Sequence, residues 1–277
     1  MREKEFHVIS TGVSIITNLK SKKKLYTDIG ISEEDRWKEI MENPEEIRKV
    51  VQIVSADPMV MSAELNTFLR VVKDKDPSNI SVFLFGTKTM SNELCRTAIQ
   101  EYLKTKGYVL YSPQEVSGYF YEAKYYPEVA VSDFQKDLFT LVDILIYIAV
   151  KKKEEGFKVF FNPTGGLKMH VVATTIAGFI TSSEVYYMNE EFNDVVFIPN
   201  LFYLPKGKEL LLLKMLLQKE ETTLEELIPS EASSCEVQEY KDGIQRLALY
   251  GLVRIKDNKI ILTERGSIIL DKIRELF

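Results

Sequence analysis

Two short segments of this sequence carry polar groups and glycines that could bind a phosphate-containing ligand. Residues 10–14 read Ser-Thr-Gly-Val-Ser and offer three hydroxyls, and residues 162–168 read Asn-Pro-Thr-Gly-Gly-Leu-Lys. Backbone N–H groups at the start of a helix favour phosphate, and glycines let a ligand approach the backbone closely. Lys168 would stand in the first turn of a helix, where it could reach a phosphate as a mobile point charge.

Neither segment is a standard nucleotide-binding loop. The sequence has no Gly-x-Gly-x-x-Gly after its first expected strand, which disfavours a dinucleotide cofactor. It has no Walker-type Gly-Lys-Ser/Thr, which disfavours ATP hydrolysis. A Gly-Gly turn alone is often a plain strand-to-helix connection, and most first-turn lysines are only solvated. Hydroxyls after one strand combined with Asn-x-Thr-x-x-x-Lys after a later strand form a more specific pattern.

The composition argues against several other kinds of site. The chain has 277 residues, 45% hydrophobic and 28% charged, with a formal net charge of −5, so it is not a polycation that coats nucleic acid. Its only cysteines are Cys95 and Cys235, and its only histidines are His7 and His170. These few side chains disfavour a disulfide framework or a zinc site, so we expect no metal and no cofactor.

The sequence also gives no sign of a membrane protein. The longest apolar stretch, residues 141–150, is about half the length that a membrane span needs. The charged residues 1–5 do not resemble a signal peptide. We therefore expect a soluble, cytoplasmic protein with no membrane partner.

Short apolar runs alternate with helical patterns up to about residue 205. We expect strands at residues 6–9, 81–85, 108–111, 157–161, 184–188 and 195–198. We expect helices at residues 33–70 (broken near 57–58), 92–106 and 133–153, a further helix that follows residues 162–168 and ends near residue 180, and a solvated basic loop at 20–24. This alternation is typical of an α/β fold with a mostly parallel sheet covered on both faces. Residues 1–205 are therefore predicted to form a Rossmann-like domain, whose ligands would bind at the carboxyl ends of the strands.

Residues 206–277 follow a different pattern after the Pro-Lys-Gly-Lys boundary at 205–208. We expect helices at 209–217, 222–227 and 235–250, strands at 251–255 and 259–262, and a final helix at 263–276. Thr223 and Glu226 have the spacing of a capping box for the second of these helices. Three helices, a hairpin and a last helix are the order of a winged helix-turn-helix domain.

Taken together, residues 9–18 and 162–168 resemble the CRISPR-associated Rossmann-fold (CARF) proteins. More narrowly, the chain is similar to the archaeal ring nucleases, in which a CARF domain is followed by a winged helix. Residues 9–18, Ile-Ser-Thr-Gly-Val-Ser-Ile-Ile-Thr-Asn, are similar to the family's opening motif. Residues 162–168 fit its signature of Asn or Asp, then Ser or Thr, then Lys or Arg four positions on. The resemblance covers both domains.

The resemblance implies a homodimer that binds a cyclic oligoadenylate and cuts it without metal, ending type III CRISPR signalling. A two-fold dimer matches cyclic tetra-adenylate better than a ring of three, and the products would be linear di-adenylate with 2′,3′-cyclic phosphate ends. Lys168 would stabilise the charge that develops on phosphorus, and Thr11, or else Ser10, would hold the attacking ribose. The ligand-binding residues would be Gly12, Val13, Ser14, Thr87, Asn162, Thr164, Gly165, Gly166 and Leu167.

A strong general base is missing from this pattern. His170 would lie about 200° around the helix from Lys168 and is expected to pack internally, and His7 is expected to be structural. An acid–base pair typically contributes 10²–10⁴-fold, so we expect slow turnover. The aromatic run Tyr119–Tyr121 could stack on adenine, although core or dimer packing is the commoner use.

Other functions remain open. A CARF sensor that does not cleave its ligand could regulate transcription through the winged helix. However, residues 206–277 carry 12 Lys and Arg against 13 Asp and Glu, which disfavours DNA binding without excluding it. An RNA nuclease switched on by the ring would need a further catalytic motif, which we do not find in residues 206–277. A small-molecule enzyme unrelated to CRISPR is the remaining alternative.

Overall fold

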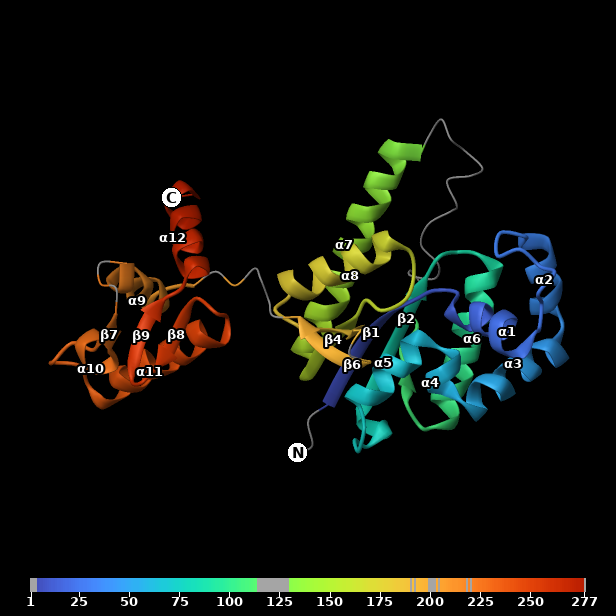
Figure 1. Ribbon diagram of the computed structural model, residues 1–277, viewed down its shortest axis with the longest axis horizontal. Coiled ribbons are helices and arrows are strands. Elements are labelled where there is room, and N and C mark those ends of the chain that lie inside the picture. Colours follow the sequence, from blue (N-terminus) through green and yellow to red (C-terminus); the bar gives the residue numbers. More distant parts are fainter. Residues whose placement is uncertain are drawn as a thin grey trace. The chain divides into compact units, whose positions relative to one another are not determined.

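The computed structural model describes residues 4–113 and 130–276, apart from residues 190, 192, 199–202, 204, 218 and 220. The chain divides into two compact units, Met1–Ile198 and Pro199–Phe277. Figure 1 shows both units and labels many of their elements. Within the described residues, no helix combines the length and apolar character that a membrane crossing requires.

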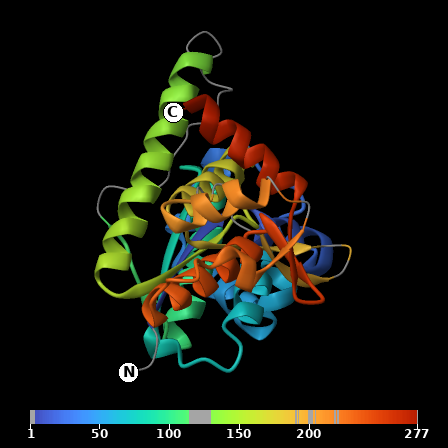
Figure 2. The ribbon, with the colours of Figure 1, turned by 90° about the vertical axis from the view of Figure 1, so that its left-hand side faces the viewer.

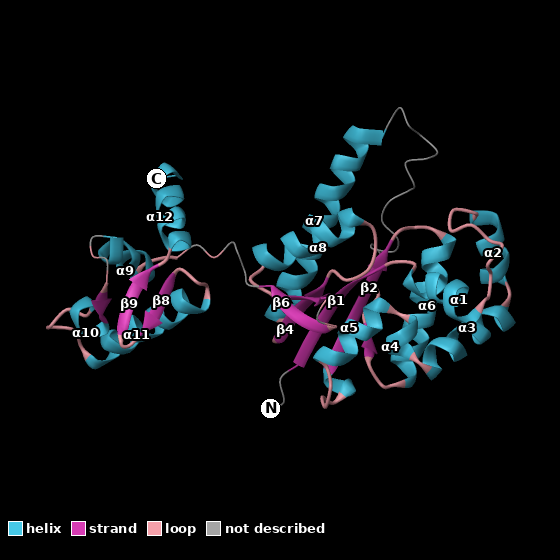
Figure 3. Cartoon of the chain, viewed as in Figure 1, coloured by secondary structure: helices cyan, strands magenta, loops and turns pink. Residues whose placement is uncertain are grey.

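The first unit is built on a six-stranded, mostly parallel sheet, which confirms the α/β prediction (Figure 3). The strand order is β3-β2-β1-β4-β5-β6, and only the β5–β6 pair is antiparallel. The strands are β1 (Lys4–Thr11), β2 (Ile80–Gly86), β3 (Val109–Leu110), β4 (Phe157–Asn162), β5 (Glu184–Asn189) and β6 (Asp194–Ile198). Because β2 and β4 flank β1 on opposite sides, the connections reverse direction at β1. In open α/β sheets, ligands typically bind at such a switch point.

Helices cover both faces of this sheet. One apolar cluster joins the sheet to the helices before β3, and the other joins it to the two helices around β4. The first group is α1 (Ser14–Lys23), α2 (Glu34–Glu42), α3 (Pro44–Ala56), α4 (Pro58–Met61), α5 (Ala63–Val71) and α6 (Met90–Thr105), with a 3₁₀ turn, η1 (Pro77–Asn79), before β2. The second is α7 (Ala130–Glu154), seen along its length in Figure 2, and α8 (Lys168–Ile180).

Two expectations for the first group of helices need correction. The lysine-rich residues 20–24 are not a loop: most of them form the last turn of α1, which ends at Lys24 in the left-handed region with φ 55°. The helical stretch 33–70 is broken three times, because Pro44, Pro58 and Ser62 each start a new helix. Proline suits a first helical turn and interrupts a helix interior, and the Ser62 side chain caps α5 by accepting the N–H of Leu65.

The second unit has a core of its own around a three-stranded antiparallel sheet, in the order β7-β9-β8. Its elements are α9 (Lys208–Leu217), β7 (Thr222–Thr223), α10 (Leu224–Leu227), α11 (Ser234–Leu249), β8 (Val253–Lys256), β9 (Lys259–Leu262) and α12 (Glu264–Leu276). The expected capping box at Thr223 does not form, because Glu226 instead accepts the hydroxyl of Thr222. A capping box is present at Ser233 and Glu236, where it starts α11.

A hydrogen-bonded network of polar side chains, buried except for Lys75, connects strands of the first unit. Lys75 and His7 both donate to Glu5, at 2.8 and 3.2 Å, and the other His7 ring nitrogen lies 2.9 Å from the Tyr186 hydroxyl. Tyr186 in turn bonds the side chain of Asn162, at the end of β4. His7 is fully buried and stacks on Phe160 with 4.6 Å between ring centroids, which confirms its structural role.

Gly178 tests how closely α8 packs on the sheet. A Cβ at this position would collide with the stiff side chain of Val185 and lie 3.2 Å from the ring of Phe161. Overpacking a close-packed core typically costs 1–3 kcal/mol. We expect Gly178→Ala to lower the free energy of unfolding by about 1–3 kcal/mol, measured by urea denaturation with Trp37 fluorescence. Thr175→Ala, in the same helix, is the control, and an equal or higher midpoint for Gly178→Ala would contradict the packing.

The buried Glu5 and His7 predict that the protein loses stability in acid. Burial alone would raise the pKa of Glu5, but hydrogen bonds from His7 and Lys75 outweigh it and lower this pKa from 4.5 to about 2. Burial lowers the pKa of His7 from 6.5, although Glu5 opposes this. The unfolded chain therefore takes up a proton at His7 below pH 6.5 and at Glu5 below pH 4.5, while the folded chain resists both.

We expect the free energy of unfolding to fall as the pH falls from about 6.5 to about 2. The Glu5 contribution, present in full above pH 4.5, should amount to roughly 3 kcal/mol and be lost between pH 4.5 and 2. In Glu5→Gln the dependence over this interval should flatten, as measured by denaturation at a series of pH values. An equally steep acid limb in that variant would show that other carboxylates dominate.

Candidate functional site

The two segments singled out in the sequence meet at the carboxyl ends of β1 and β4. Register places Thr11 opposite Gly86 of β2, and Ile9 opposite Asn162 of β4, so the three strands end at the same edge. A Cβ on Gly12 would lie only 2.6 Å from the backbone nitrogen of Gly166. The β1–α1 loop and the β4–α8 turn are therefore in direct backbone contact at the switch point, which requires glycine at position 12.

Ser10 and Thr11 are both fully buried, and their hydroxyls bond within the chain. As neighbours in a strand they point to opposite faces of the sheet. Ser10 donates to the carbonyl of Gly165 at 2.6 Å and so holds the β4–α8 turn. Thr11 lies 2.9 Å from both the carbonyl of Phe85 and the side-chain oxygen of Asn92. A direct contact of either hydroxyl with a ribose would need an exchange of these partners, and this role stays a prediction.

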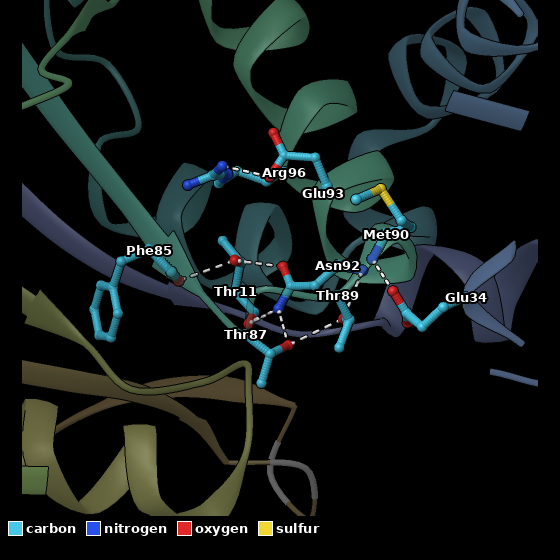
Figure 4. Close-up of polar contacts among 9 residues, drawn as sticks. All are labelled: Thr11, Glu34, Phe85, Thr87, Thr89, Met90, Asn92, Glu93 and Arg96. Atoms are coloured by element: carbon cyan, nitrogen blue, oxygen red, sulfur yellow. Dashed lines mark hydrogen bonds and ion pairs between the residues drawn. The ribbon is translucent and has the colours of Figure 1, made fainter. Parts of the chain in front are cut away.

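Asn92 connects Thr11 to the loop after β2, as Figure 4 shows. Its amide nitrogen donates to the Thr11 carbonyl and to the Thr87 hydroxyl, both at 2.9 Å. Thr89 caps α6 and accepts the backbone N–H of Asn92. Thr87 is half-buried, so part of its surface is accessible just after the end of β2. Sequence reasoning missed Asn92, although Thr89 and Asn92 have the spacing of a helix cap.

The β4–α8 turn is built around the buried side chain of Asn162. Its oxygen accepts the backbone N–H and the hydroxyl of Thr164, at 3.1 and 2.6 Å. This is the local bonding that asparagine offers to a turn. Gly166 then adopts φ 97°, a conformation that side chains rarely tolerate, and the chain enters α8. The buried Asn162 side chain thus fixes the shape of the turn. Within the turn, Thr164 is half-buried and Gly166 is exposed.

The start of α8 is exposed and has no acidic residue of its own. Leu167 and Lys168 are exposed, no acidic residue stands in the first turn, and no side chain caps the helix. The first backbone N–H groups of a helix lack partners within it. The Lys168 ammonium makes no hydrogen bond or ion pair with any residue that the structure describes. Uncapped N–H groups and an available cation together suit a phosphate.

Glu64, which sequence reasoning also missed, lies between the two loops and is only 1% exposed. It stands in the first turn of α5, yet its carboxylate accepts the backbone N–H of Gly12 at 2.7 Å and the hydroxyl of Ser14 at 2.6 Å. Two ligand-binding candidates from the sequence, Gly12 and Ser14, therefore already bond inside the protein. Only the fold brings residue 64 to residue 12, so no local pattern in the sequence could have shown it.

Neither histidine is placed to act as a base at this site. His170 is fully buried, with its ring edge-on to Phe85 at 5.7 Å, which confirms that it packs internally. His7 lies in the hydrogen-bonded network that connects strands of the first unit. In the described parts of the chain, no three His, Cys, Asp or Glu side chains cluster to hold a metal. The aromatic run 119–121 lies outside the described residues.

The ligand-binding candidates thus separate into two groups. The partly or fully exposed ones are Val13, Thr87, Thr164, Gly166, Leu167 and Lys168, although the hydroxyls of Thr87 and Thr164 already bond to Asn92 and Asn162. The second group consists of residues that are buried or that bond to the side chain of Glu64: Ser10, Thr11, Gly12, Ser14, Asn162 and Gly165. Residues of the second group hold the loops at this edge of the sheet in place, and residues of the first group lie at its surface.

Two solved structures show distant similarity to this chain. Protein VC1899 from Vibrio cholerae matches with 9% identity and a TM-score of 0.36, over 96% of this chain and 64% of that one. Can2 from Sulfobacillus thermosulfidooxidans, solved in complex with cyclic tetra-adenylate, matches with 11% identity and a TM-score of 0.30, over 76% of this chain and 60% of that one. The chain thus spans less than two thirds of the length of either protein.

A family model gives a more direct assignment. The model of the CRISPR-associated protein family Cas_APE2256 matches residues 59–201, just over half of the 277 residues. The matched region runs from α4 across β2 and β4 to β6, so it contains the β4–α8 turn and Lys168. The chain therefore belongs to this family of CRISPR-associated proteins.

Proposed function

We propose that this protein is a ring nuclease that binds cyclic tetra-adenylate and cleaves it to linear di-adenylate with 2′,3′-cyclic phosphate ends. The observation that carries the proposal is the exposed Lys168 at the uncapped start of α8, beside the Gly12–Gly166 contact. Membership of a CRISPR-associated family and the CARF-like motifs support the same ligand class. Such an activity would end type III CRISPR signalling.

The proposed chemistry needs no nucleophile from the protein. The 2′-oxygen of a ribose forms a bond to the adjacent phosphorus and loses its proton. The bond from phosphorus to the 5′-oxygen breaks, and that oxygen takes up a proton. Holding the 2′-oxygen in line with the leaving oxygen supplies much of the acceleration. Lys168 and the N–H groups of the α8 start would stabilise the negative charge that grows on the phosphoryl oxygens.

In this proposal Ser10 and Thr11 hold the loops that carry the ligand. Ser10 fixes the turn through Gly165, and Thr11 links β1 to Asn92 and the β2–α6 loop. For Thr11 to hold the attacking ribose as well, its hydroxyl would exchange Asn92 for the ribose. Because the residues that the structure describes place no acid–base pair at the site, turnover should be slow, which suits an enzyme that times the end of a signal.

We further propose a homodimer, because a two-fold axis would match the symmetry of a four-membered ring. Each protomer would contribute one α8 start and one Lys168, placed on phosphates at opposite sides of the ring. Two cuts would then release two identical di-adenylates.

For the second unit we propose a winged helix with a role other than DNA binding. The order α9, α10, α11, the β8–β9 hairpin and α12 fits that domain. Several of its basic side chains are engaged in ion pairs: Lys208 with Glu239, Arg246 with Glu209, Lys219 with Glu226 and Lys259 with Glu221. A hollow beside α11 and the hairpin is lined by Leu224, Ile244, Ile255 and Ile260 together with Lys241, Gln245 and Asn258. The ion-paired basic groups make this unit a poor match for phosphates.

Lys168→Ala should abolish cleavage while leaving the fold intact, because the side chain is exposed and unpaired among the described residues. Removing one group that stabilises a developing oxyanion costs about 10²–10³-fold in rate. The assay is conversion of labelled cyclic tetra-adenylate in EDTA under single-turnover conditions. Lys73→Ala, an exposed lysine remote from these loops in the sequence, should keep the wild-type rate. Unchanged cleavage by Lys168→Ala would overturn the assignment.

The non-cleaving sensor predicts a different result with nucleic acid. If the second unit read DNA, the protein would retain a duplex in a ligand-dependent way. We expect no retention in a gel-shift assay at physiological salt, with or without cyclic tetra-adenylate, because acidic partners engage these basic groups. Ligand-dependent retention with an intact ring recovered afterwards would favour the sensor.

A further inference from the structure

The side chain of Asn162 can hold the β4–α8 turn in only one of its two amide directions. Its oxygen accepts the backbone N–H and the hydroxyl of Thr164, at 3.1 and 2.6 Å. A backbone N–H can only donate, so after a rotation of the amide by 180° two donors would face each other and this bond would be lost. The two directions have nearly the same shape, so packing does not choose between them. The partners of the Asn162 NH₂ group therefore decide the direction.

This NH₂ group has two N–H donors and two buried partners. Its nitrogen lies 3.5 Å from the backbone carbonyl of Glu64, at the limit of a hydrogen bond. Its second partner is the hydroxyl of Tyr186. The β4–β5 register sets Phe161 opposite Val185, so the residues that follow them are neighbours on one face of the sheet. Asn162 and Tyr186 are both 0% exposed, so bulk water does not replace either partner.

The Tyr186 hydroxyl can accept from Asn162 because His7 takes its proton side. The Glu5 carboxylate can only accept, so the His7 nitrogen 3.2 Å from it, Nε2, carries a proton. Burial lowers the pKa of His7 from 6.5, so at pH 7 the ring is neutral and its Nδ1 is an acceptor. The Tyr186 hydroxyl, 2.9 Å from Nδ1, donates to it and keeps its oxygen lone pairs for Asn162. Lys75, which can only donate, binds Glu5 at 2.8 Å and completes the sequence of donors and acceptors.

We propose that Tyr186 is a positioning residue of this site, whose hydroxyl fixes the direction of the Asn162 amide and thereby holds the β4–α8 turn in its shape. Tyr186 acts only through Asn162 and does not contact the ligand. The inference rests on the proposed function for the ligand and for the part that the turn plays in cleavage, whereas the fixing of the turn concerns the protein alone. The turn leads directly into α8, so it also places Lys168. A positioned group that is displaced by about 1 Å can cost about 10²-fold in rate.

A purely structural Tyr186 would behave differently. Loss of a structural hydrogen bond lowers the free energy of unfolding, and the amides of the whole first unit then open more often. Loss of positioning opens one turn while the strands beneath it keep their stability. It also lowers the rate at saturation more than the affinity, because the groups carried by the turn act mainly on the charge that develops in the transition state.

The test uses Tyr186→Phe, which keeps the ring and removes only the hydroxyl. Hydrogen exchange of the backbone amides is followed by NMR in the full-length protein without ligand. The Thr164 amide should be protected in the wild type and exchange about tenfold faster in the variant, because one buried donor of Asn162 loses its partner. The amide of Val8, in the central strand β1, should keep its rate. Tyr187→Phe, the same change one residue along β5 and on the opposite face, should behave as the wild type.

Asn162→Asp shows whether Tyr186 acts through the amide. A carboxylate presents an oxygen to Thr164 in either direction, so it has no direction to be fixed. Adding Tyr186→Phe to Asn162→Asp should therefore leave the exchange of the Thr164 amide unchanged, and an equal acceleration in both backgrounds overturns the inference. If Tyr186→Phe does not fold, His7→Phe takes its place with the same criteria. It keeps a ring against Phe160 and removes the acceptor of the Tyr186 hydroxyl.

The same variants are then assayed with labelled cyclic tetra-adenylate in EDTA. Tyr186→Phe should cleave about tenfold more slowly at saturation, with a dissociation constant that changes by less than about threefold. A Thr164 amide that is unprotected in the wild type, or that keeps its rate in a folded Tyr186→Phe protein, overturns the inference. Faster exchange without slower cleavage overturns the role of Tyr186 in the reaction. A wild-type protein that neither binds nor cleaves the ring refutes the proposed function instead, and the exchange rates still decide whether Tyr186 fixes the turn.

Discussion

The backbone contact between Gly12 and Gly166 is the constraint on which the rest of the site depends. It brings the end of β1 and the turn after β4 together so closely that a single Cβ would separate them. Adjacent parallel strands place their ends side by side, but only side-chain-free backbones can then touch. Because Gly166 also takes φ 97°, the turn delivers α8 with its first N–H groups beside the β1–α1 loop. The position of Lys168 follows from this contact.

Loops at a sheet edge have few apolar partners, so other interactions must stabilise this contact. Here they are hydrogen bonds made by buried side chains: Ser10 with Gly165, Asn162 with Thr164, and Glu64 with Gly12. Each bond satisfies a group that would otherwise be costly to bury. The hydrogen-bonded network that links Glu5, His7 and Tyr186 also includes the side chain of Asn162. The accessible groups at this edge of the sheet are thus held in place by buried polar groups whose hydrogen bonds are made within the protein.

The sequence predicted the fold well because short apolar runs and helical periods are local signals. The mostly parallel sheet and the place of Lys168 in the first turn of a helix are confirmed. Residues 20–24 were placed wrongly because lysine suits the last turn of a helix as well as a loop. Glu64 and Asn92 could not be predicted as members of the site for another reason. They bond to Gly12 and Thr11, which are 52 and 81 residues away in the sequence. No spacing rule connects positions so far apart.

The same separation in sequence explains why a hydroxyl-bearing residue, taken without its partners, is weak evidence for a binding site. Ser10, Thr11 and Ser14 look like ligand groups in the sequence, yet each finds a partner inside the protein. Lys168 differs because the structure gives it no partner among the described residues, and because nearby backbone N–H groups add to its charge rather than cancel it. Availability after folding, more than residue type, therefore separates a binding group from a bracing group. By that criterion we propose the start of α8 as the place where a phosphate binds.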